Sequence, residues 1–191
     1  MHSATLISAL AFVGTALSVP LSIPRQANAC FLVGSTTLPA EVVSAANFLA
    51  SKVTCSSTAK TISGVPDVTS GSTSFSSINF ASSSQSPLSF ALSEFATATP
   101  LASTDLALFE ERANVYTATE AGIRSVGGAL AIKAPKFFLA FQVARIKAAQ
   151  GVANPEPGQQ VDHLLGKVTK NAIRESKATL DAITALSKVL A

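Results

Sequence analysis

Few residues of this 191-residue chain have types that could support acid–base chemistry. His163 is the one histidine beyond the first two residues, and it directly follows Asp162 at the start of an expected helix. Neighbours in a helix do not face each other, so Asp162 is not placed to orient His163 as a triad acid would. Glu110 and Glu111 form an acidic doublet whose helical setting suggests exposure rather than a glycosidase pair. We therefore predict a protein that is not an enzyme, with a hydrolase using an unrecognised site near His163 as an alternative.

Cys30 and Cys55 are the remaining candidates for chemistry. An even cysteine count in a secreted chain predicts a disulfide, and with two cysteines its pairing is fixed. Redox-active or metal-binding thiols are the rival interpretation, but the cysteines lack C-x-x-C spacing and have no histidine nearby. With so few ligand types no metal site is expected, and no glycine-rich phosphate-binding motif points to a cofactor.

The N-terminus has the layout of a secretory leader. Residues 1–18 combine a short polar start with an uncharged apolar run that is short for a membrane span. We expect residues 1–18 to be a signal peptide and residues 19–29 a candidate pro-segment, with cleavage after Ser18 or after Ala29. The mature chain, residues 30–191, is then expected to be secreted and extracellular, without a transmembrane segment.

Eleven phenylalanines, in a chain without tryptophan, allow two interpretations. Phenylalanine at helical spacing usually belongs to a plain hydrophobic core. The alternative is a pocket between helices that holds a lipid or another apolar ligand. The candidate lining residues for such a pocket are Phe95, Phe109, Phe137 and Phe141.

Basic residues gather in the same region, where Lys133, Lys136, Arg145 and Lys147 occur without an acidic residue among them. This cluster could meet an anionic surface, such as a membrane or an acidic polysaccharide. The alternative is that the acidic first half and the basic second half pack together and their fields partly cancel. The net charge of +3 is too small to indicate nucleic acid as a partner.

Apolar residues at helical spacing predict that the elements positioning these residues are helices. Five helices are expected at residues 37–53, 86–95, 104–124, 136–150 and 160–191, the last with a bend or a projecting end. We expect Ser86 to cap the second helix and Ser103 or Thr104 to cap the third. Residues 54–86 are rich in serine and threonine and are interpreted as a long connection with one or two short extended pieces. The predicted fold class is all-α, a single-domain bundle of four to five helices with one disulfide.

Six strings of residues resemble a family of fungal small secreted proteins. They are residues 64–71 (GVPDVTSG), 84–88 (SQSPL), 95–101 (FATATPL), 125–128 (SVGG), 133–139 (KAPKFFL) and 161–164 (VDHL). The resemblance covers most of the mature chain and implies a fungal source and an extracellular destination. It carries no established activity, so no functional residue follows from it.

The leading hypothesis is a secreted, non-enzymatic interaction or surface protein with an effector-like role. It rests on the leader, on the missing catalytic constellation and on a charged fraction of only 13%. An extracellular carrier of an apolar ligand such as a lipid is the first alternative, and the secreted hydrolase is the second. The expected partner is a cell-surface, host or lipid component.

Overall fold

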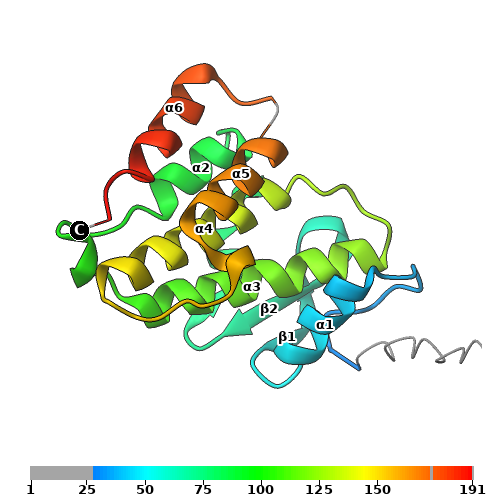
Figure 1. Ribbon diagram of the computed structural model, residues 1–191. Coiled ribbons are helices and arrows are strands. Elements are labelled where there is room, and N and C mark those ends of the chain that lie inside the picture. Colours follow the sequence, from blue (N-terminus) through cyan, green and yellow to red (C-terminus); the bar gives the residue numbers. More distant parts are fainter. Residues whose placement is uncertain (1–27, 173, 191) are drawn as a thin grey trace, which may run out of the picture.

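The computed structural model describes residues 28–172 and 174–190 (Figure 1). This part of the chain contains six α-helices and three strands, so the fold is mixed α/β. The elements are α1 (Ala40–Leu49), β1 (Thr54–Lys60), β2 (Pro66–Ser70), β3 (Thr73–Ser74), α2 (Pro87–Glu94), α3 (Leu106–Ser125), α4 (Lys133–Ala149), α5 (Val161–Asn171) and α6 (Lys177–Leu186). The prediction of an all-α bundle is therefore wrong, although the disulfide that it included is confirmed.

The three strands form an antiparallel sheet in the order β1-β2-β3, within the segment that the sequence predicts to be a connection. β2 packs against α3 and buries Val68 completely. A strand usually shows alternating apolar residues, but β2 contains Pro66 and Asp67, and β1 is polar and almost entirely exposed. The all-α prediction failed because few apolar residues anchor this sheet, which leaves almost no period-two signal.

The turn between β2 and β3 is held from outside the sheet by Glu111 of α3. Its carboxylate accepts hydrogen bonds from the Ser72 amide at 3.1 Å and from the hydroxyls of Ser72 and Thr73 at 3.3 and 3.4 Å. Gly71 has a φ of +54°, and a Cβ there would lie 1.9 Å from Glu111 Oε1. The turn therefore needs glycine for its backbone conformation, and a Cβ there would also displace the Glu111 carboxylate that holds the turn.

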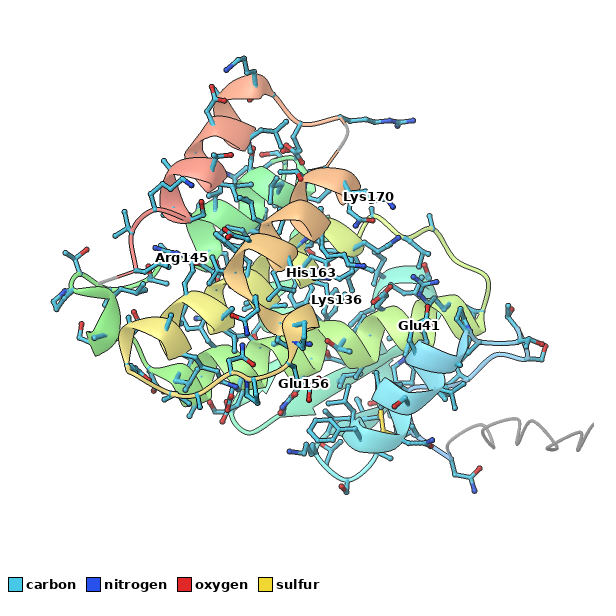
Figure 2. The ribbon with its side chains drawn as sticks, in the orientation of Figure 1. Glu41, Lys136, Arg145, Glu156, His163 and Lys170 are labelled. Atoms are coloured by element: carbon cyan, nitrogen blue, oxygen red, sulfur yellow. A yellow bond between two sulfur atoms is a disulfide. The ribbon has the colours of Figure 1, made fainter. Side chains whose placement is uncertain are left out.

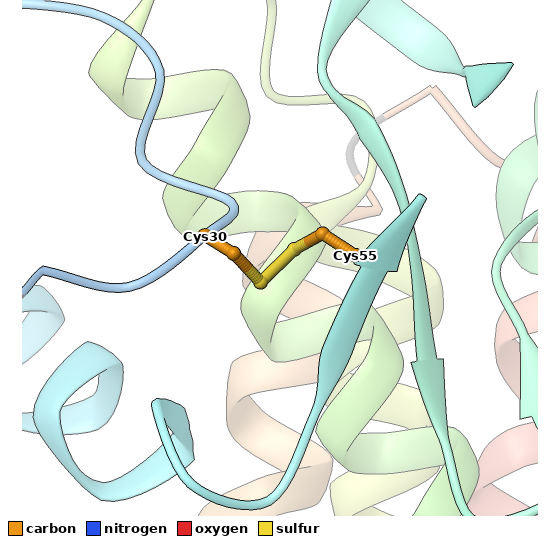
Figure 3. Close-up of a disulfide and its surroundings, with 2 residues drawn as sticks. All are labelled: Cys30 and Cys55. Atoms are coloured by element: carbon orange, nitrogen blue, oxygen red, sulfur yellow. A yellow bond between two sulfur atoms is a disulfide. The ribbon is translucent and has the colours of Figure 1, made fainter. Parts of the chain in front are cut away.

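The N-terminal segment is attached to the sheet and to α3. The disulfide joins Cys30 to Cys55 in β1 and closes a loop that contains α1 (Figure 3). The Gly34 amide donates to Ser125 Oγ at 3.1 Å, and a Cβ on Gly34 would lie only 2.0 Å from Ser125 O. Phe31 is fully buried in a small core with residues of α1, β2 and α3. These contacts fix the chain on both sides of α1.

α3 is the central helix, with the sheet on one side and α4 and α5 on the other (Figure 1). Tyr116 of α3 packs in the main core against the rings of Phe75 and Phe95, with ring centroids 5.3 and 5.6 Å apart. Its hydroxyl donates to Ile78 O at 2.6 Å, and burial raises the pKa of its phenol. This cluster joins α3 to α2 and to the segment after the sheet.

The helix caps agree with the sequence prediction at α2 and differ at α3. Ser86 accepts a backbone N–H in the first turn of α2, as predicted. α3 begins at Leu106, one or two residues later than these caps imply, because Asp105 accepts the backbone N–H of Leu108. Asp105, and not Ser103 or Thr104 as predicted, is therefore the N-cap of α3.

The expected last helix is divided into α5 and α6. Glu175, between them, accepts hydrogen bonds from Ser86 Oγ at 2.5 Å and from the Leu88 amide at 3.0 Å, at the N-terminus of α2. A carboxylate is favourable at a helix N-terminus, because backbone N–H groups without helical partners point toward it. Ser176 then caps α6. Glu175 thus ties the α5–α6 connection to α2.

The predicted signal peptide and residues 19–27 of the candidate pro-segment lie outside the described residues. Ala29, after which the second proposed cleavage would fall, is described and is buried in the same small core as Phe31. Within residues 28–172 and 174–190, no helix has both the length and the apolar character needed to cross a membrane.

Candidate functional site

An open groove of about 560 Å³ lies between α1, α3, α4 and α5. α3 and α4 supply its floor, α1 lies along one side, and α5 with the loop before it lies along the other. The floor is hollow because the residues of α3 and α4 that face it include Ala113, Ala140 and Ala144. A volume of this size falls within the range of small-molecule sites in proteins.

Aromatic and aliphatic side chains form much of the groove wall. Phe48 of α1 is 61% exposed, and Phe137 of α4 is half-buried. Leu49, Val143 and Leu164 add aliphatic surface from α1, α4 and α5. A large exposed aromatic residue beside concave apolar surface is a typical ligand contact, so this wall suits the apolar part of a ligand.

The rim of the groove is cationic. In the described structure four lysines line it: Lys52, Lys136, Lys147 and Lys167. Lys147 Nζ lies 2.8 Å from Glu110 Oε1, and Lys136 Nζ lies 2.5 Å from Glu120 Oε2. The other two lysines form no ion pair with any residue that the structure describes. The rim therefore keeps an excess of positive charge.

Aromatic rings hold two of these lysines beside the apolar wall. Lys52 Nζ lies 4.2 Å from the centre of the Phe48 ring, and Lys136 Nζ lies 4.1 Å from the centre of the Phe137 ring. A cation over an aromatic face is attracted by the negative face of the ring. Positive charge and apolar surface thus lie side by side at two places on the rim.

Glu120 is the buried acid behind the rim. Its side chain is 4% exposed, and its second oxygen, Oε1, lies 2.8 Å from Arg124 Nη2. One carboxylate is therefore shared between Arg124 and Lys136. A buried carboxylate is stable only when it is paired and hydrogen-bonded, so this triad anchors α4 to α3.

The structure separates the four phenylalanines that the sequence predicts to line an apolar-ligand pocket. Phe137 lines the groove. Phe95 and Phe141 are fully buried and Phe109 is almost so, and all three belong to the main core. Phe95, Phe109 and Phe141 are therefore core residues, and Phe137 is the one of the four that is placed to contact a ligand in the groove.

The predicted basic patch is also divided. Lys136 and Lys147 line the groove, and Lys133 is half-buried at the first residue of α4. Arg145 lies elsewhere along the same helix, away from Lys136, and is 1% exposed (Figure 2). Arg145 is therefore not part of a surface patch.

His163 lies in the first turn of α5 and is exposed, as is Asp162 (Figure 2). Successive positions on a helix point in different directions, which agrees with the expectation that Asp162 does not orient His163. Among residues 28–172 and 174–190, no group of three or more His, Cys, Asp or Glu side chains is placed to hold a metal ion.

Three residues that line the groove were not predicted from the sequence: Phe48, Lys52 and Lys167. They come from α1, the turn after it and α5, which only the fold brings together. The position of Phe48 in the helical pattern could have predicted its role at the site. Phe48 lies off the apolar face of its helix defined by Val42, Ala46 and Leu49, and a large aromatic residue on a polar face suggests a contact.

The fold and the groove together define a small disulfide-bonded α/β protein with a lysine-rimmed groove between helices. The chain belongs to the family described as Domain of unknown function (DUF7143), which matches residues 32–191. The match includes every helix and strand of the described structure and begins just after Cys30. No curated protein and no solved structure matches the chain.

Proposed function

We propose that this chain is an extracellular, non-enzymatic binding protein whose groove holds an anionic amphiphile, such as a fatty acid. The observation that carries the proposal is the combination of an apolar wall and a cationic rim in one groove of about 560 Å³. The hydrocarbon part of the ligand lies on the floor of α3 and α4. Its acidic head lies at the rim beside Lys52 or Lys167.

The chemistry of the groove supports an anionic rather than a neutral ligand. Glu110, which pairs with Lys147, is the one acidic residue among the groove-lining residues described. Lys52 and Lys167 thus leave two positive charges at the rim for a ligand. Apolar burial supplies most of the affinity in such a site, and a charge-assisted contact fixes the orientation of the head group.

The extracellular setting is supported by the leader-like N-terminus and by the Cys30–Cys55 disulfide, because disulfides persist mainly in oxidising environments. The resemblance to fungal small secreted proteins supports the same setting. A role as a surface or effector-like interaction protein is compatible with ligand binding and stays a prediction.

Native mass spectrometry of the protein purified from culture medium tests the proposal first. We expect additional mass that is lost on denaturation and that corresponds to a lipid with an acidic head. The purified and delipidated protein is then titrated with dodecanoate and with dodecyltrimethylammonium. Dodecanoate is expected to bind at least tenfold more tightly, and equal binding of the cationic amphiphile contradicts an anionic ligand.

Variants locate the ligand within the groove. Lys52→Gln with Lys167→Gln is expected to weaken dodecanoate binding by about tenfold, the loss of one charge-assisted contact. The matched control is Lys60→Gln with Lys188→Gln, which changes the net charge equally at exposed positions outside the groove. Ala140→Trp fills the floor and is expected to abolish binding. If the control pair weakens binding as much as the rim pair, the rim is not the head-group site.

A further inference from the structure

Arg145 of α4 is a positive charge inside the protein. Its Nη1 donates to Gln142 Oε1 at 2.6 Å and its Nη2 donates to Val189 O at 2.8 Å, while its buried Nε has no hydrogen-bond partner in the described structure. Both acceptors are neutral, and no carboxylate of the described residues forms an ion pair with Arg145. A guanidinium stays protonated, so the protein buries a charge that nothing in the described fold balances.

Neutral groups hold this guanidinium in a fixed position. Gln142 Nε2 donates to Phe95 O at 2.9 Å, which leaves its Oε1 facing Arg145. The Phe141 ring centre lies 5.7 Å from the guanidinium carbon. Burial lowers the pKa of Arg145, as expected for a cation removed from water. Arg145 is therefore oriented in advance but not neutralised, unlike Lys136, whose carboxylate partner belongs to the fold.

Arg145 and Gln142 line a pocket of about 340 Å³, to which Thr97 and Thr99 add further polar groups. The other walls come from α2, from residues 96–101, from α6 and from Val189. These walls are mainly apolar, with Leu92 contributed by α2 and Leu186 by α6. The pocket is near the lower end of the volume range of small-molecule sites and does not share a lining residue with the groove.

We propose that this pocket binds a small monocarboxylate with an apolar body, with its carboxylate on the Arg145 guanidinium and its body against Leu92 and Leu186. Because Nη1 and Nη2 already donate within the fold, the Nε–H is the donor left for a carboxylate, which also balances the guanidinium charge. The apolar walls favour an organic acid over an inorganic oxyanion. An organic acid can bury its methylene groups against these walls, whereas an inorganic oxyanion has no apolar part to bury. This site is independent of the proposed groove ligand.

Thermal unfolding and calorimetric titration of the intact, disulfide-bonded chain test the proposal with hexanoate, acetate and sulfate. A ligand that binds only the folded state raises the unfolding temperature. We expect hexanoate to bind at least tenfold more tightly than acetate or sulfate, since each buried methylene adds affinity. Equal shifts for the three anions at equal ionic strength indicate a simple oxyanion site and overturn the apolar part of the proposal. No saturable binding of any of them overturns it entirely.

Two variants distinguish the pocket from the groove. Arg145→Met is expected to remove the tight hexanoate site and to leave at most the weak binding of a short chain in the groove. The Lys52→Gln with Lys167→Gln variant is expected to leave the tight site within twofold of the wild type. Leu186→Trp keeps Arg145 but fills the pocket, so it is expected to weaken hexanoate binding at least tenfold even if Arg145→Met folds poorly. If hexanoate still binds to Leu186→Trp but not to the variant with Lys52→Gln and Lys167→Gln, hexanoate binds in the groove. That result overturns the proposal.

Discussion

The groove and the Arg145 pocket are two cationic sites built along the same helix, and they treat positive charge in opposite ways. At the groove, Lys136 and Lys147 have carboxylate partners, and the remaining lysines line an open rim. At the pocket, Arg145 is 1% exposed and has only neutral partners. The groove can therefore stand empty at little cost, whereas the pocket carries a desolvated charge that a bound anion would balance.

This difference shows why a cluster of basic residues in a sequence does not define one surface. Lys133, Lys136, Arg145 and Lys147 occur within 15 consecutive residues, yet the turns of α4 direct them to different surroundings. The partner of each cation, and not its position in the sequence, decides whether it stabilises the fold or is available for a ligand.

Removing the disulfide is expected to have the largest effect on stability and to loosen the groove side most. Replacing Cys30 and Cys55 by serine releases the loop that contains α1, which costs about 3.5 kcal/mol in the chain-entropy model. Urea denaturation measures this loss of unfolding free energy. Hydrogen exchange in α2 and α6 should become faster only by what the global loss accounts for, whereas α1 should lose additional protection through local opening. If exchange in the helices around Arg145 became faster by as much as exchange in α1, the groove and the Arg145 pocket would belong to one unit that unfolds together.

Glu120→Gln is expected to destabilise the protein by about 3 kcal/mol, since removing the shared carboxylate leaves two cations without their partner. Its two cations, Arg124 and Lys136, are partly exposed, which places the expected effect at the low end of the usual range. Denaturant unfolding measures it. Glu110→Gln, which removes an exposed partner of Lys147, is the matched control and should cost under about 0.5 kcal/mol.

Arg145→Met is expected to change the unfolding free energy by no more than about 1 kcal/mol without ligand. The variant leaves Gln142 Oε1 and Val189 O without their donor, but it also removes the cost of an unbalanced buried charge. Chemical denaturation in ligand-free buffer is the measurement. A loss as large as that of Glu120→Gln would mean that Arg145 is a structural residue of the fold rather than a ligand residue.

Lys147→Gln is expected to give the smallest effect, under about 0.5 kcal/mol, because its ion pair with Glu110 is partly exposed to water. The effect should decrease further at 1 M salt, where charges are screened over a few ångströms. Denaturation curves at low and high salt measure both values. An effect that persists at high salt would indicate that Lys147 contributes through packing in the groove.

The helices were largely predictable from the sequence, because apolar residues at helical spacing and a Ser86 cap define them locally. The sheet was not, because β1 is polar and exposed and β2 includes Pro66 and Asp67. A bend or a projecting end was expected in the last helix, but the place where α5 ends and α6 begins was not, because it depends on Glu175 reaching the N-terminus of α2, far away in the sequence. Contacts of this kind leave no periodic pattern.

The candidate sites were predictable only in part. Phe137, Lys136 and Lys147 were identified from local composition, and they line the groove. Lys52 and Lys167 could not be grouped with them, because the grouping requires α1 and α5 to pack on either side of α3 and α4. Arg145 was identified as basic, but its burial and its lack of an acidic partner are properties of the tertiary structure.

The serine- and threonine-rich strand β1 lies at an edge of the sheet, next to β2 alone. An edge strand offers unpaired backbone groups to a second chain and so invites association between molecules. Here the pairing of β1 shifts register between Cys55 and Lys60, and the strand ends in an exposed lysine. Irregular pairing and an edge lysine both hinder strand addition. The polar composition that concealed the sheet from sequence analysis therefore also protects it from edge-to-edge aggregation.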